Sequence, residues 1–151
     1  MSDSFRQATG RKVLSRASAQ ELGEVSHLLL DLQRRQIAAV VIGHGKKAQL
    51  VDWGRLTGFG PDAVMVSDED ALRAPADDRE RAAADGKLEL VGKPALTEAG
   101  NELGTIDDVT FDPDTGEVET LRIDAREIPA SSLLGTGSFA VVVDASQEPA
   151  S

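Results

Sequence analysis

The sequence has no cysteine, few aromatic residues and two histidines. Without cysteine the chain can form no disulfide, no zinc-thiolate site and no cysteine nucleophile. Its five aromatic residues form no run suited to stacking bases, which argues against RNA binding by this chain alone. These residues are Phe5, Trp53, Phe59, Phe111 and Phe139.

A long hydrophobic segment is also missing. The longest apolar run, residues 37–42, has six residues, whereas a membrane-spanning helix needs about 18 or more. Residues 1–10 lack the apolar core of a secretory signal. We therefore expect a soluble, cytoplasmic protein without a transmembrane segment, and the lack of cysteine fits a reducing compartment.

Residues suited to catalysis or metal binding are sparse. His27 and His44 have no further histidine at ligand spacing and no adjoining pair of carboxylates. Residues 43–47, GHGKK, lack the GxxxxGK[ST] pattern of a phosphate loop and fit a hairpin connection better. The sequence contains no nucleophile elbow and no GxGxxG fingerprint. We expect no enzyme activity, no catalytic residue, no cofactor and no bound metal.

The charge is unevenly distributed along the chain. The net charge is -10, and residues 1–75 carry ten cations against nine acids, while residues 76–151 carry six against seventeen. Nucleic acid is disfavoured as a partner, because binding to phosphates needs clustered cations. Two readings stay open for the acidic half: added solubility, or a neighbour different from that of the first half.

The chain contains an internal repeat. Residues 22–42 align without a gap on residues 103–123 at an offset of 81, and a second block, from Leu56 to Val64, recurs at an offset of 77. Four residues are lost between the blocks, as expected of a surface loop. The apolar positions of the first block match at 25/106, 28/109, 30/111, 37/118, 40/121 and 42/123.

The local patterns predict short strands and turns. In repeat 1 we expect strands at 12–15, 21–31, 36–42, 49–53 and 63–67, and in repeat 2 at 88–97, 102–111, 117–123, 126–129 and 138–144. The period-two pattern slips by one residue between Val25 and Leu28 and again at Asp107 and Asp108, which predicts a β-bulge in both copies. Residues 112–116, DPDTG, predict a hairpin turn with positive φ at Gly116.

These elements predict an all-β chain of two tandem small β-barrels joined by a linker. We place repeat 1 at 1–68, an acidic, alanine-rich linker with a short helix at 69–87, repeat 2 at 88–145 and a flexible tail at 146–151. The linker helix has almost no apolar face and is expected to be a solvated spacer.

The motifs of repeat 2 resemble the PRC-barrel domain, the small β-barrel shared by the H subunit of bacterial photosynthetic reaction centres and the ribosome maturation factors. The resemblance rests on ELG at 102–104, DPDTG at 112–116 and AVVV at 140–143, and repeat 1 matches more loosely. It implies a stand-alone tandem PRC-barrel protein that serves as a binding or assembly module.

Three functions remain open on this basis. The first is a non-enzymatic protein-interaction module that binds another protein through one barrel, or that forms a homo-oligomer. The second is an accessory factor in ribosome or RNA maturation. The third is a soluble component associated with a membrane electron-transfer complex.

Two groups of residues are candidate sites for these functions. Trp53, Arg55 and Phe59 form a candidate protein-interaction anchor, because such residues dominate interface hot spots. The alternative for Trp53 is packing at the barrel mouth or between the two copies. An acidic patch, suited to a solvated face or to Ca²⁺, comprises Asp107, Asp108, Asp112, Asp114, Glu117 and Glu119.

Overall fold

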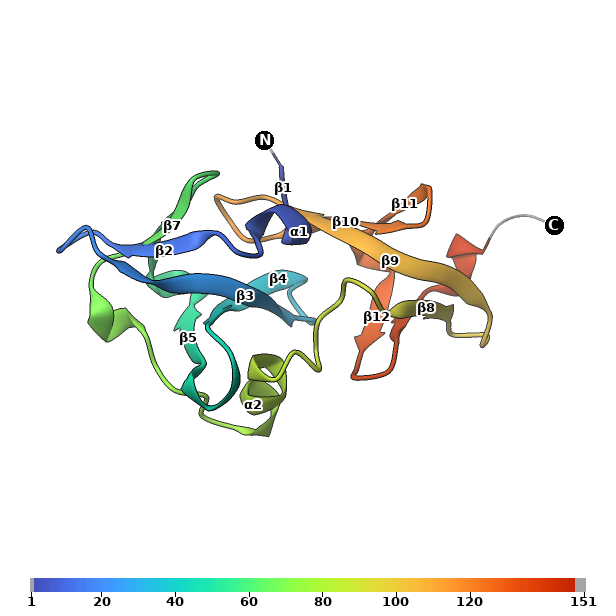
Figure 1. The fold of residues 1–151 in the computed structure, drawn as a ribbon. Coiled ribbons are helices and arrows are strands. Elements are labelled where there is room, and N and C mark those ends of the chain that lie inside the picture. Colours follow the sequence, from blue (N-terminus) through green and yellow to red (C-terminus); the bar gives the residue numbers. More distant parts are fainter. Residues whose placement is uncertain (1, 149–151) are drawn as a thin grey trace.

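The computed structural model describes residues 2–148, which fold mainly into two β-sheets that lie side by side (Figure 1). The sheet of repeat 1 contains β2 (Lys12–Ser15), β3 (Glu21–Asp31), β4 (Gln36–Ile42), β5 (Gln49–Asp52), β6 (Leu56–Phe59) and β7 (Ala63–Val66). The sheet of repeat 2 contains β8 (Pro94–Thr97), β9 (Glu102–Phe111), β10 (Val118–Ile123), β11 (Arg126–Pro129), β12 (Leu133–Thr136) and β13 (Val141–Val143). No helix within residues 2–148 is long and apolar enough to cross a bilayer.

The two sheets have the same strand order. It is β5-β4-β3-β2-β7-β6 in repeat 1 and β11-β10-β9-β8-β13-β12 in repeat 2. In each sheet one pair is parallel, β2 with β7 and β8 with β13, and the other neighbours are antiparallel. Two copies of one topology are what the internal repeat predicts.

The pairing register also recurs between the copies. Leu28 pairs with Val40 across β3 and β4, and Val109 pairs with Leu121 across β9 and β10, each pair 81 residues from the other. The register shifts at Ser26 in β3 and at the equivalent Asp107 in β9, so both predicted bulges are confirmed. The positive φ predicted for Gly116 is confirmed at 80°.

Left-handed backbone conformations repeat in the same way. At three positions a glycine in one repeat is replaced in the other by a residue with a side chain, and φ stays positive. It is 56° for Ala19, 49° for Arg35 and 54° for Asp124. The fold therefore imposes this conformation on the position, whether or not glycine occupies it. The recurring pairs are Gly10/Gly92, Ala19/Gly100, Gly23/Gly104, Arg35/Gly116 and Gly43/Asp124.

Closed barrels were predicted, but within residues 2–148 both sheets are open. The two end strands of each sheet, β5 with β6 and β11 with β12, do not pair. In each case the two strands are consecutive and joined by a 3₁₀ turn, Trp53–Arg55 or Ala130–Ser132, which redirects the chain between them. Strands β6 and β12 are short and were not predicted as separate strands.

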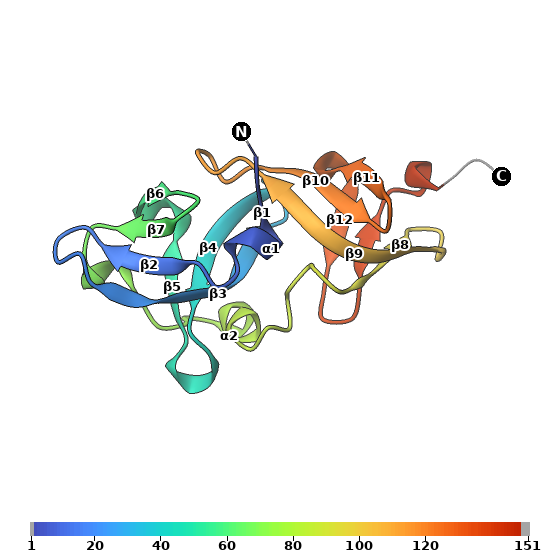
Figure 2. The ribbon, with the colours of Figure 1, turned by 45° about the horizontal axis from the view of Figure 1, so that its top comes forward.

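The N-terminal segment crosses to the other repeat. The two-residue strand β1 (Asp3–Ser4) pairs with β9 as a seventh strand of the repeat 2 sheet, and α1 (Phe5–Ala8) follows it (Figure 2). Phe5 is buried against Phe111, with ring centroids 5.7 Å apart. Arg11 then forms a largely buried ion pair of 2.7 Å with Asp3.

The main hydrophobic core is continuous through both repeats. Each sheet contributes the inner faces of its long strands, and all four predicted core pairs are buried. The repeats therefore stabilise each other by sharing apolar contacts, as their small size requires. The pairs are Leu28/Val109, Leu30/Phe111, Val40/Leu121 and Ile42/Ile123.

The linker helix is packed rather than solvated. Helix α2 (Asp78–Ala84) buries Ala83 and Ala84 against the outer face of the repeat 1 sheet, beside Leu29, Val41 and Leu50. The expectation of a solvated spacer is therefore wrong. Alanine side chains are small enough for close approach to a sheet, so two of them suffice as an apolar face.

Candidate functional site

The two repeats meet through their hairpin turns. The Ile37 N–H donates to the Gly116 carbonyl at 2.8 Å, and the Val118 N–H donates to the Arg35 carbonyl at 2.8 Å. The two donors, Ile37 and Val118, are 81 residues apart, and so are the two acceptors, Arg35 and Gly116. The junction therefore has an approximate two-fold symmetry. A β-bridge between Gln36 and Glu117 lies at its centre.

Trp53 packs on one side of this junction. A Cβ atom on Gly116 would lie 2.7 Å from Cε2 of Trp53, so only glycine fits beneath the indole. The Trp53 ring lies 5.4 Å from that of Phe59 and 6.4 Å from that of Phe111. An aromatic cluster from both repeats therefore closes the shared core here.

Arg35 occupies the equivalent place on the other side. Its Nε donates to the Ala130 carbonyl at 2.9 Å and its Nη2 to the Leu133 carbonyl at 3.0 Å. Ala130 is the equivalent of Trp53, and Arg35 is the equivalent of Gly116. Large and small residues have exchanged places: Trp53 covers Gly116 at one side, and Arg35 covers Ala130 at the other.

The structure brings together two of the three predicted anchor residues. Phe59 is only 8% exposed, and Trp53 is half-buried, with its edge facing a hollow of about 170 Å³ beside Pro113 and Asp114. Arg55 is exposed on the 3₁₀ turn. Trp53 and Phe59 thus both contact Phe111 of the other repeat, and Trp53 alone of the two remains partly accessible.

The predicted acidic patch is spread along β9, its turn and β10. The Asp108 carboxylate accepts a hydrogen bond from the backbone N–H of Arg6 at 3.1 Å, and the Asp112 carboxylate accepts one from the Asp114 N–H at 2.8 Å within its own turn. The Glu119 carboxylate accepts one from Ser2 Oγ at 2.6 Å. Asp107, Asp114 and Glu117 complete the patch. Within residues 2–148, no group of three or more His, Asp or Glu residues is arranged to hold a metal ion.

An exposed apolar surface, not predicted from the sequence, lies at the β12–β13 hairpin. Phe139 is 78% exposed and Leu134 45%, and they are the two exposed large hydrophobic residues among residues 2–148. Phe139 lines a hollow together with Leu96, Ala140 and Val142. The equivalents of Phe139 and Leu134 in repeat 1 are Asp62 and Thr57. Alignment of the two repeats at the offset of 77 therefore shows, from the sequence alone, that repeat 2 has apolar residues at two positions where repeat 1 has polar ones.

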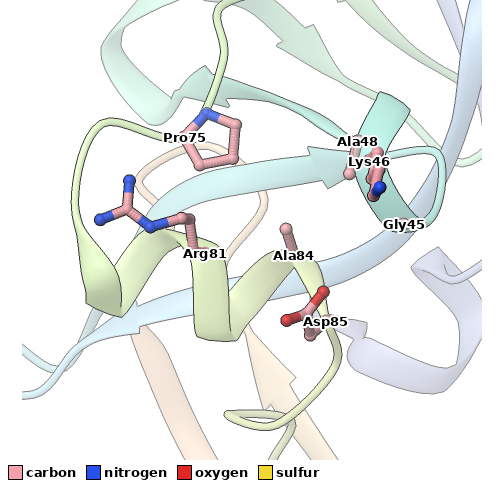
Figure 3. A pocket seen from close by; sticks show the side chains of 7 residues that line it. All are labelled: Gly45, Lys46, Ala48, Pro75, Arg81, Ala84 and Asp85. Atoms are coloured by element: carbon pink, nitrogen blue, oxygen red, sulfur yellow. The ribbon is translucent and has the colours of Figure 1, made fainter.

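A cavity of about 370 Å³ lies between the β4–β5 connection and α2 (Figure 3). Pro75, Ala84 and Lys46 face one another across it, and Arg81 and Asp85 project from the helix at its edge (Figure 3). His44 precedes the lining residue Gly45 in the sequence, the His27 ring lies close to Gly86 at the end of the linker helix, and the two rings are 6.5 Å apart. The His27 Nδ1 atom is buried, has no hydrogen-bond partner within residues 2–148, and lies 3.7 Å from a Glu89 carboxylate oxygen.

An ionic network fixes the linker that forms one wall of the cavity. Arg73 is bonded to both carboxylate oxygens of Glu80, at 2.7 and 2.6 Å, and to Asp52 of β5, the closest contact being 2.7 Å. The hydrogen bonds from Arg73 lower the pKa of Glu80 to about 2, and burial opposes this effect. The bonds to Glu80 and Asp52 raise the pKa of Arg73. The linker is therefore held on the edge of the repeat 1 sheet.

The fold defines a class of small β-proteins built from two copies of one mixed sheet. Residues 88–144 match the model of the PRC-barrel domain family, so the chain carries a PRC-barrel domain in repeat 2. The same strand order in repeat 1 is consistent with a second PRC-like unit, although the match covers residues 88–144 alone. No curated protein matches the chain.

Proposed function

We propose that the chain is a non-enzymatic protein-interaction module that binds its partner through the Phe139 surface, defined as Phe139, Leu134, Leu96, Ala140 and Val142. The observation that carries this proposal is the 78% exposure of Phe139. Exposed aromatic side chains in apolar surroundings are typical of interface hot spots.

Comparison of the repeats supports a role for this surface. At the same position of the same hairpin, repeat 1 has Asp62, which is exposed, while its own phenylalanine, Phe59, is buried at the junction. The fold therefore does not need an aromatic residue at position 139. An exposed aromatic side chain that adds nothing to the core is best explained by a contact outside the chain.

Repeat 1 acts in this proposal as the support. It contributes Phe5, Trp53 and Phe59 to the cluster around Phe111 of repeat 2. Its own outer face is covered by α2. Repeat 1 thereby stabilises repeat 2 and leaves the hairpin of β12 and β13 free to bind.

The partner has a basic surface around an apolar pocket. Residues 76–151 carry seventeen acids against six cations, so this half of the chain attracts a cationic protein and repels a second copy of itself. We therefore expect binding to weaken as the salt concentration rises.

The test is Phe139→Asp, which gives repeat 2 the residue that repeat 1 has at this position. The partner captured by the wild-type protein is identified and purified, and its affinity is measured by calorimetry. We expect an affinity loss of roughly thirtyfold or more, as for a hot-spot residue, and a free energy of unfolding changed by less than about 0.5 kcal/mol.

Asp62→Ala is the matched control and should leave the affinity unchanged. Equal affinities of the wild type and Phe139→Asp would contradict the proposal. A wild-type dimer that Phe139→Asp converts to a monomer would show instead that the surface binds a second copy.

A further inference from the structure

The cavity between the β4–β5 connection and α2 has the size and surroundings of a small-molecule site. Its volume of about 370 Å³ falls within the range of roughly 300–1,000 Å³ typical of ligand pockets. Its walls come from two segments that are distant in sequence, residues 45–48 and residues 75–85 (Figure 3). It is remote from the Phe139 surface in the fold and shares no lining residue with it.

One wall is formed by an insertion that the sheet does not need. In repeat 1 the connection from β4 to β5 takes six residues, 43–48, whereas in repeat 2 two residues, 124–125, join the equivalent strands β10 and β11. Two residues therefore suffice to close this hairpin. The four additional residues lie where α2 crosses the sheet, and repeat 2 has no helix at the equivalent place among the described residues.

The floor of the cavity is apolar. Ala48 and Ala84 are 3% and 6% exposed and belong to the cluster beneath α2. The Pro75 ring adds a further apolar wall. A short hydrocarbon group would lie against these three side chains, none of which carries a polar group.

The edge of the cavity formed by residues 45–48 is cationic in an otherwise acidic protein. Residues 43–48 include one histidine and two lysines and no acid, while the chain as a whole has a charge of -10. Lys46 has no ion-pair partner within residues 2–148. Arg81 is paired with the exposed Asp78 at 2.7 Å. Asp85 is the one carboxylate that lines the cavity.

We propose that this cavity binds a small organic monoanion with a short hydrocarbon body. The hydrocarbon lies against Ala48, Ala84 and Pro75, and the anionic group pairs with the Lys46 ammonium. At the opposite edge Arg81 is paired with Asp78 and Asp85 is anionic, so Lys46 is the cation that receives the anionic group. The proposal does not depend on the protein-interaction role of repeat 2.

The test is a titration of the full-length protein with hexanoate, followed by amide NMR. We expect saturable shifts at Gly45, Lys46, Ala84 and Asp85. Lys46→Gln should weaken binding roughly tenfold, the value of one charge-assisted hydrogen bond, while Asp85→Asn should strengthen it. Lys47→Gln is the matched control, because Lys47 is the neighbouring lysine and does not line the cavity.

Two further probes separate the contributions of charge and hydrocarbon. 1-Hexanol lacks the charge and sulfate lacks the apolar body, so both should bind more weakly than hexanoate. Equal binding of hexanoate by Lys46→Gln and Lys47→Gln, equal binding of 1-hexanol and hexanoate, or shifts that do not saturate would overturn the proposal. Because Lys46 is exposed, we expect Lys46→Gln to keep the melting temperature of the wild type. This measurement checks that the variant is folded.

Discussion

At the scale of single residues, the junction between the repeats depends on an exchange of large and small side chains. Trp53 lies on Gly116, and Arg35 reaches the carbonyls of Ala130 and Leu133. A tryptophan at position 130 as well as 53 would meet Arg35, and an arginine at position 116 as well as 35 would meet Trp53. Divergence at these positions has therefore made each repeat specific for the other.

Gly116→Ala should destabilise the protein for two reasons that can be separated. The alanine would have to keep a φ of 80°, and its Cβ would lie 2.7 Å from Trp53. We expect the free energy of unfolding to fall by about 2–4 kcal/mol. Gly100→Ala has a similar φ of 89° with no atom within 4 Å, so it should cost only about 1 kcal/mol. Denaturant unfolding followed by tryptophan fluorescence measures both.

A double-mutant cycle tests the contact itself. In a Trp53→Ala background, monitored by circular dichroism, Gly116→Ala should cost no more than Gly100→Ala, because the indole is gone. Equal costs of Gly116→Ala with and without Trp53 would mean that the indole does not rest on Gly116. Trp53→Ala alone should cost about 2–4 kcal/mol, and a solvent-exposed emission spectrum of the wild type would favour the partner-anchor hypothesis instead.

At the scale of elements, equivalent strands differ because their outer faces have different neighbours. Strand β4 reads QIAAVVI and is apolar on both faces, since α2 covers the outer one. Strand β10 reads VETLRI, in which the buried residues Val118, Leu121 and Ile123 are separated by more exposed ones. The covering helix is itself held by Arg73, which connects Glu80 of α2 with Asp52 of β5.

The Glu80–Arg73 pair predicts a pH dependence of stability. The pKa of Glu80 is lowered in the folded protein from 4.5 to about 2, so the folded state binds the proton less readily than the unfolded state does. The stabilisation is fully present above pH 4.5 and is lost as the pH falls towards 2. Glu80→Gln should therefore be less stable than the wild type at neutral pH, and the difference should shrink in acid.

Unfolding of both proteins by urea between neutral pH and the acid range measures this difference. Asp78→Asn is the control, because Asp78 is fully exposed and pairs with Arg81, which is also exposed, and exposed pairs contribute little, about 0–1 kcal/mol. A difference between Glu80→Gln and wild type that stays constant with pH would show that Glu80 stabilises α2 through packing or shape alone.

At the scale of the whole molecule, the two repeats share one core, and the N-terminal strand of repeat 1 joins the sheet of repeat 2. Strand β1 lies at the start of repeat 1 but pairs with β9 of repeat 2, and Phe5 is buried against Phe111. The main cluster of buried residues runs through both sheets. Neither sheet can therefore lose its structure without exposing apolar surface of the other.

We expect a single cooperative unfolding transition for both repeats. Differential scanning calorimetry should give a calorimetric enthalpy equal to the van't Hoff enthalpy. Phe5→Ala should lower the melting temperature without dividing the transition, because it removes a contact that both repeats share. Two separate transitions, or a van't Hoff enthalpy well below the calorimetric one, would show that the repeats unfold independently.

The sequence by itself determined the repeat, most strands, both bulges and the left-handed turn at Gly116. Each depends on local chemistry: the two-residue period of a strand, a slip in that period, and the turn preferences of proline and glycine. The acidic patch and the pairing of Trp53 with Phe59 were also identified as candidates from residue type and spacing.

Only the tertiary structure decided that the sheets stay open, that the alanines of α2 are buried, and that Phe139 is exposed while Phe59 is not. The exchange at the junction and the cavity beside Lys46 were decided in the same way. These features depend on side chains that are distant in sequence and meet only after folding. Because identical residue types can lie on either side of a hairpin, composition and period alone do not determine which of them faces the partner repeat.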